Sequence, residues 1–73
     1  MQECWEDLAN AIILQAVEDY RLARKVLRRR PEWQPALRMQ RDTTRFFQSR
    51  WFARLTDMDG ASLLKGLREE AID

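Results

Sequence analysis

The scarcity of helix-breaking residues constrains the fold of this chain more than any other feature. Its 73 residues include only two glycines and two prolines. Pro31 and Pro35 lie close together in the middle, and Gly60 and Gly66 lie near the C-terminus. Between them, apolar residues recur at the three- and four-residue spacing of helices, without a useful stretch of strand-like alternation. The sequence therefore predicts an all-α fold, with residues 1–73 forming a single helical domain.

The first predicted helix is long and runs from about Glu3 to Arg30. Acidic residues open it and arginines close it, an order that complements the helix dipole. Pro31 then disfavours helical backbone at the preceding residue. The apolar residues that we expect to face the core share one side of this helix: Trp5, Leu8, Ala9, Ile12, Ile13, Ala16, Tyr20, Ala23, Val26 and Leu27.

The second predicted helix begins between Glu32 and Pro35 and ends near Gln48. Proline is tolerated there because its missing N–H would have no partner in a first helical turn. The expected core-facing side of this helix is again defined by helical spacing: Trp33, Ala36, Leu37, Thr44 and Phe47, widened by Met39, Thr43 and Phe46.

Two shorter helices should complete the bundle. Ser49 is suited to cap a short connecting helix, Arg50–Leu55, whose side chains Trp51, Phe52 and Leu55 should fill the core. An aspartate of the following Asp-Met-Asp stretch should cap a C-terminal helix over Gly60–Ala71.

The first helix is too long for the domain that it must cover. About 28 residues in a helix span ~42 Å, whereas a compact domain of this size is only about 30 Å across. We therefore expect this helix to overhang the body, to kink, or to pack on something else.

A second, weaker apolar line runs along the opposite side of the first helix. It could consist of scattered surface residues, which are normal. It could also be a contact surface for a partner or a second copy of the chain, or be covered by the later helices. The line consists of Cys4, Ala11, Leu14 and Leu22.

The near-neutral net charge of +1 hides a strong segregation along the chain. Residues 1–20 carry five acids and no bases, and residues 51–73 carry five acids and three bases. Residues 21–50 carry ten bases and two acids, and nine of those bases are arginine. Arginine favours bidentate pairing with phosphate or carboxylate groups.

The basic middle segment predicts an arginine-rich face with three possible roles. It could be a solvated surface, a site for an acidic protein partner, or a site for the nucleic-acid backbone. A helix-turn-helix reading of the last two helices is disfavoured, because acidic residues surround the would-be recognition helix. The candidate contact residues are Arg21, Arg24, Arg28, Arg38, Arg41 and Arg45.

Asp19 lies at the edge of the main apolar stripe, beside Tyr20. A half-buried carboxylate usually needs a cation or hydrogen-bond donors. We expect it to tether the first helix to the second, through an arginine or through the hydroxyls of Thr43 and Thr44.

The residue content argues against an enzyme and against a bound cofactor or metal ion. The chain has no histidine, the commonest general base and metal ligand, and its single Cys4 cannot make a zinc site. Asp-Met-Asp-Gly at 57–60 resembles part of a calcium loop, but Ala61 and Arg68 occupy ligand positions.

Compartment signals are equally sparse. One cysteine allows no internal disulfide, so a reducing cytoplasm is the default expectation. The N-terminal residues are acidic where a signal peptide would be basic. The longest apolar run is far shorter than a membrane span, so we expect no membrane partner.

Two stretches of sequence are distinctive. Residues 9–21 read Ala-Asn-Ala-Ile-Ile-Leu-Gln-Ala-Val-Glu-Asp-Tyr-Arg, and residues 45–60 read Arg-Phe-Phe-Gln-Ser-Arg-Trp-Phe-Ala-Arg-Leu-Thr-Asp-Met-Asp-Gly. Together they resemble short uncharacterised proteins encoded by prophages and integrative elements of Gram-positive bacteria. The resemblance implies context alone: small proteins of such elements often regulate phage genes or block a host machine.

These observations predict a non-enzymatic protein-interaction module from a phage or mobile element, which could form a homo-oligomer. In this role it would regulate or inhibit a host machine. The alternative is a nucleic-acid-backbone binder that uses the arginine-rich face.

Overall fold

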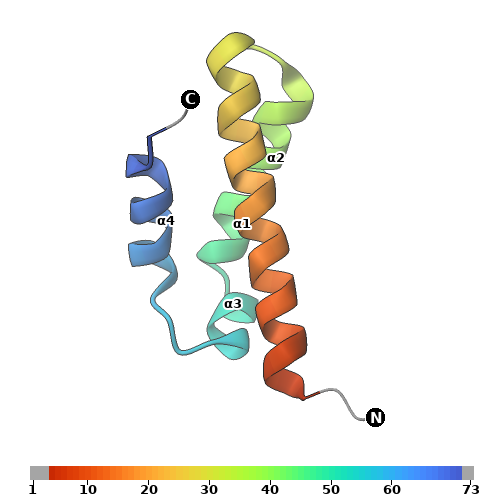
Figure 1. The fold of residues 1–73 in the computed structure, drawn as a ribbon, viewed down its shortest axis with the longest axis vertical. Coiled ribbons are helices and arrows are strands. Elements are labelled where there is room, and N and C mark those ends of the chain that lie inside the picture. Colours follow the sequence, from red (N-terminus) through yellow and green to blue (C-terminus); the bar gives the residue numbers. More distant parts are fainter. Residues whose placement is uncertain (1–3, 72–73) are drawn as a thin grey trace.

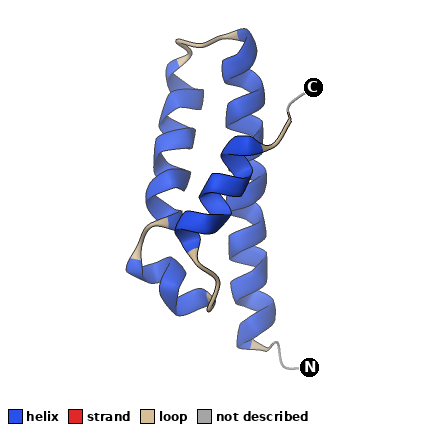
Figure 2. Ribbon diagram, turned by 90° about the vertical axis from the view of Figure 1, so that its left-hand side faces the viewer, coloured by secondary structure: helices blue, strands red, loops and turns tan. Residues whose placement is uncertain are grey.

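A computed structural model of the chain describes residues 4–71 and shows four helices, with no strand among those residues. They are α1 (Trp5–Arg29), α2 (Gln34–Phe47), α3 (Arg50–Leu55) and α4 (Gly60–Glu69). Helices α1 and α2 form an antiparallel hairpin, α3 lies beside the N-terminal half of α1, and α4 crosses one face of the hairpin (Figures 1 and 2). The predicted all-α bundle is confirmed.

Helix α1 runs the length of the molecule as one continuous helix (Figure 1). Its 25 residues account for about 37 Å of a longest dimension of 42 Å. The radius of gyration, 13.3 Å, exceeds the value of ~11 Å for a compact domain of this length. The first helix is therefore longer than the ~30 Å width of a compact domain of this size, and the molecule is elongated along it. Its predicted start at Glu3 lies outside the described residues.

The ends of α2 and α3 follow from local chemistry. Pro35 lies in the first turn of α2, where it costs no helical hydrogen bond. Ser49 caps α3, because its Oγ accepts a hydrogen bond from the Phe52 amide at 3.2 Å. The predicted bounds Arg50–Leu55 are confirmed.

Helix α4 begins where it meets the end of α2. Asp59 occupies the N-cap position, and its carboxylate accepts a hydrogen bond of 2.7 Å from the Ser62 hydroxyl. This hydrogen bond lowers the pKa of the Asp59 carboxyl. Gly60 lies so close to the Phe47 carbonyl that a Cβ there would be 1.9 Å from the oxygen. The helix ends at Glu69, two residues before the predicted Ala71.

Aromatic rings form the centre of the core. The side chains of Tyr20, Phe47, Phe52 and Leu64 are almost completely buried. The Phe47 ring meets those of Tyr20 and Phe52 edge-on, with centroids 6.3 and 5.7 Å apart, an arrangement that adds to the burial of apolar area. These four side chains come from four different helices, so every helix contributes to the centre of the core.

The predicted core stripe of α1 is too wide. Its centre is buried, including Ala9, Ile13 and Tyr20, but Trp5, Leu8 and Ile12 are exposed. Val17, which the sequence reasoning left out of the stripe, is buried instead. The core-facing line of α1 is therefore rotated toward Val17, because α2 and α4 converge on that side.

Two tryptophans after the turn were also wrongly expected in the core. Trp33 precedes α2 and is 45% exposed, and Trp51 on α3 is 48% exposed. The other two apolar side chains of α3, Phe52 and Leu55, are buried in the core as expected. A helix of six residues has room to bury only one side, so its two neighbouring aromatic residues must diverge.

Candidate interaction surfaces

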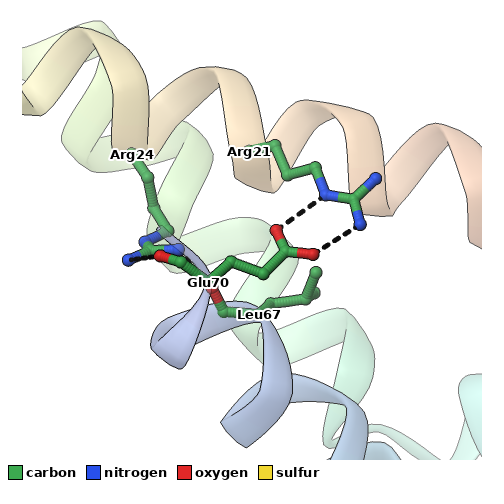
Figure 3. A network of polar contacts seen from close by, with 4 residues as sticks. All are labelled: Arg21, Arg24, Leu67 and Glu70. Atoms are coloured by element: carbon green, nitrogen blue, oxygen red, sulfur yellow. Dashed lines mark hydrogen bonds and ion pairs between the residues drawn. The ribbon is translucent and has the colours of Figure 1, made fainter. Parts of the chain in front are cut away.

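Two arginines of α1 hold the C-terminal end of α4 (Figure 3). Arg21 makes a bidentate ion pair with Glu70, from Nε to Oε1 at 2.9 Å and from Nη2 to Oε2 at 2.6 Å. Arg24 donates to the main-chain carbonyls of Leu67, of Arg68 at 2.9 Å and of Glu70 at 3.2 Å. These contacts join segments more than 40 residues apart in the sequence.

The arrangement follows from the chemistry of a helix end. The last carbonyls of α4 have no partner within the helix, and the helix dipole makes this end negative. The guanidinium of Arg24 supplies both donors and positive charge. The Arg21 guanidinium holds the pKa of the Glu70 carboxyl below its usual range, and Glu70 raises the pKa of Arg21.

The predicted arginine face is consequently divided between two places. Arg21 and Arg24 are used within the chain to fix α4, and Arg28 is exposed one turn further along α1. The three arginines of α2 are exposed on the side opposite its buried residues Ala36, Thr43 and Phe47. This second set consists of Arg38, Arg41 and Arg45.

Acidic residues accompany part of the α2 set. Arg38 lines a shallow hollow together with Asp19 and Asp42. The prediction that Asp19 tethers α1 to α2 is wrong: its carboxylate accepts a hydrogen bond from Gln15 on the same helix at 3.0 Å. The hydroxyls of Thr43 and Thr44 likewise donate to carbonyls of their own helix.

The second apolar line of α1 lies entirely in solvent. Its four residues are exposed, and Leu14 and Leu22 are 55% and 51% accessible to solvent. The later helices of the described chain do not wrap around it, so that alternative is wrong. We refer to Cys4, Ala11, Leu14 and Leu22 as the outer line.

An exposed aromatic patch adjoins the outer line, although the sequence analysis expected its residues in the core. Trp5 of α1 and Trp51 of α3 are 53% and 48% exposed, and their rings meet edge-on with centroids 6.3 Å apart. Leu8 and Ile12 extend the exposed apolar surface along the next two turns of α1. We call these four residues the aromatic patch. The sequence carried a signal for this patch. Around the helix axis, Trp5, Leu8 and Ile12 all lie to one side of Ala9 and Ile13.

The described residues contain no cluster suited to a metal ion. Across residues 4–71, no group of three or more cysteine, aspartate or glutamate side chains converges. Within that same range, no helix combines the length and hydropathy of a membrane span. Neither a protein-family model, nor a curated protein, nor a solved structure matches this chain.

Proposed function

We propose that this chain is a non-enzymatic protein-interaction module whose contact site is the aromatic patch together with the outer line of α1. The observation that carries the proposal is the pair of exposed, mutually packed rings of Trp5 and Trp51. Leu8 and Ile12 continue the same apolar surface.

The energetics of apolar surface favour a partner at this site. Fully burying a leucine-sized side chain contributes about 1.5–3 kcal/mol relative to leaving it in water. The fold obtains only part of that gain from Trp5, Leu8, Ile12 and Trp51. Contiguous apolar surface of this kind is typical of protein contact sites, and tryptophan is enriched among the residues that dominate their binding energy.

The biological setting belongs to the same proposal. The resemblance to short proteins of prophages and integrative elements supports a module that acts in the bacterial cytoplasm. There it would regulate or inhibit a host machine by contact.

Site-specific photo-crosslinking tests the proposal. A photoreactive amino acid is placed at Leu8, at Trp51, or at the exposed Lys65 of α4 as a control. We expect a discrete protein adduct from the first two positions in expressing bacterial cells, and none from Lys65. Circular dichroism verifies that each variant is folded. Absence of any protein adduct at Leu8 and Trp51 would refute the proposed function.

A second candidate function, binding of the nucleic-acid backbone, is favoured by the three exposed arginines of α2. Three phosphate contacts give a log–log salt slope of at most about −2.7 on duplex DNA. Fluorescence anisotropy of a labelled duplex across salt concentrations measures that slope. Replacement of Arg38, Arg41 and Arg45 by glutamine should abolish binding, whereas Lys65→Gln should not. If the anisotropy of the duplex does not rise on addition of the protein at ~50 mM salt, this candidate function is excluded.

A further inference from the structure

The exposed side of α1 carries the residue spacing of a helix–helix seam. Cys4, Leu8, Ala11, Gln15 and Leu22 follow one another in steps of four, three, four and seven, and all are exposed. Steps of three and four are those of the a and d positions in paired helices. This seam lies opposite the buried residues of α1, so the rest of the described chain does not obstruct it.

Charge is distributed unevenly along the same helix. Its first turn carries the acids Glu6 and Asp7, and its last turn carries Arg28 and Arg29. Lys25 adds a further exposed cation near the basic end. Two such helices side by side in the same direction would place like charges together. In opposite directions, the acidic end of each would meet the basic end of the other.

From this spacing and charge order, we propose that the occupant of the seam is a second copy of this chain, with the two α1 helices paired antiparallel. The inference rests on the proposed function, because it names the partner of the same surface. Antiparallel a-to-d pairing sets Ala11 against Leu22 of the second copy and Gln15 against its Glu18. The same register sets Leu8 against Lys25 of the second copy, and Asp7, the residue before Leu8, lies beside that lysine.

Two-fold symmetry makes every one of these contacts occur twice. The same register brings Trp5 beside Val26 of the second copy, so the aromatic patch flanks the interface and Trp51 borders it. The seam runs along α1 from Cys4 to Leu22, which gives a physical reason for a helix of this length.

Sedimentation equilibrium tests the pairing. Wild-type protein should show a monomer–dimer equilibrium between about 1 and 500 μM, and Leu22→Glu should weaken dimerisation at least about tenfold. Met58→Glu is the matched control, because Met58 and Leu22 are both 51% exposed and Met58 lies outside the seam. Its dimerisation should equal that of the wild type. A wild-type monomer throughout this range overturns the inference.

Charge reversal tests the direction of pairing. Asp7→Lys alone and Lys25→Asp alone should each weaken dimerisation about tenfold, since each creates two like-charge contacts. The combined variant should recover wild-type dimerisation. If the combined variant is weaker than both single variants, the antiparallel register is wrong.

The failure of this inference differs from the failure of the proposed function. Photo-crosslinks from Leu8 to other proteins, with a monomer in the ultracentrifuge, would retain the interaction module and exclude self-pairing. Crosslinks between two copies, lost in Leu22→Glu and kept in Met58→Glu, would support both.

Discussion

Replacement by alanine should have opposite effects on stability at the two glycines, Gly60 and Gly66. At Gly60, an added Cβ would lie 1.9 Å from the main-chain oxygen of Phe47 and 3.0 Å from its carbonyl carbon. Both atoms belong to the backbone at the end of α2, so the conflict cannot be relieved by rotating a side chain. At Gly66, an added Cβ would meet nothing within 4 Å. Both glycines belong to α4, so the same substitution at one position is a matched control for the other.

The expected effects have opposite signs. Gly66→Ala removes backbone entropy from the unfolded chain at an open helical position, and should stabilise the protein by about 0.5–1 kcal/mol. Gly60→Ala forces α4 away from the end of α2 and should destabilise it by about 1–3 kcal/mol, the usual cost of overpacking. For a domain of this length, each kcal/mol corresponds to about 4–8 °C in Tm.

Thermal unfolding followed by circular dichroism at 222 nm measures both effects. Gly66→Ala should melt above the wild type and Gly60→Ala below it, with urea unfolding giving the same order. A Gly60→Ala variant as stable as Gly66→Ala would refute the close approach of α4 to the end of α2. In that case the junction of these helices would be looser than the structure shows.

Three further predictions concern the arginine contacts and the exposed rings. Arg24→Met keeps the apolar stem but leaves the last carbonyls of α4 without these donors, so it should lower the free energy of unfolding by about 1–3 kcal/mol. Amide hydrogen exchange should become faster in α4 before it does in the other helices. Arg21 lowers the pKa of Glu70 in the folded protein. The stabilising effect of Glu70 should therefore be present at neutral pH and be lost as pH falls below the ordinary value of about 4.3. The Tm values of wild type and Glu70→Gln should differ at pH 7 and converge near pH 2. The three tryptophans are about half exposed, so acrylamide should quench native fluorescence efficiently, and Trp51→Ser should change stability by less than about 1.5 kcal/mol; blue-shifted, protected emission from monomer would contradict their placement.

Helix positions were predictable because their determinants are local. Pro31 ended the first helix, Ser49 began the third, and Gly60 began the fourth, as the sequence reasoning expected. Proline geometry and capping act within one turn of the backbone, so neighbouring residues suffice to specify them. The C-terminal end of α4 was placed less well, because the Arg24 contacts that meet its last carbonyls come from a distant segment.

The candidate surfaces were only partly predictable. The outer line was identified because its residues lie opposite the main stripe, but the sequence left open whether the later helices cover it. The aromatic patch was missed, since Trp5 and Leu8 satisfy helical spacing as well as truly buried residues do. Hydrophobic periodicity identifies a side of a helix, but the width of the buried strip depends on which helices pack there.

The sequence by itself determined an all-α chain, four helices and a first helix longer than its domain. It also determined the separation of acidic and basic segments, because charge order and helix breakers are properties of the chain. Only the tertiary structure decided that Arg21 and Arg24 bind the end of α4, and that Trp5 and Trp51 remain in solvent. The first outcome depends on where α4 crosses the α1–α2 hairpin, and the second depends on how α3 packs against α1; both are long-range contacts that local sequence does not specify.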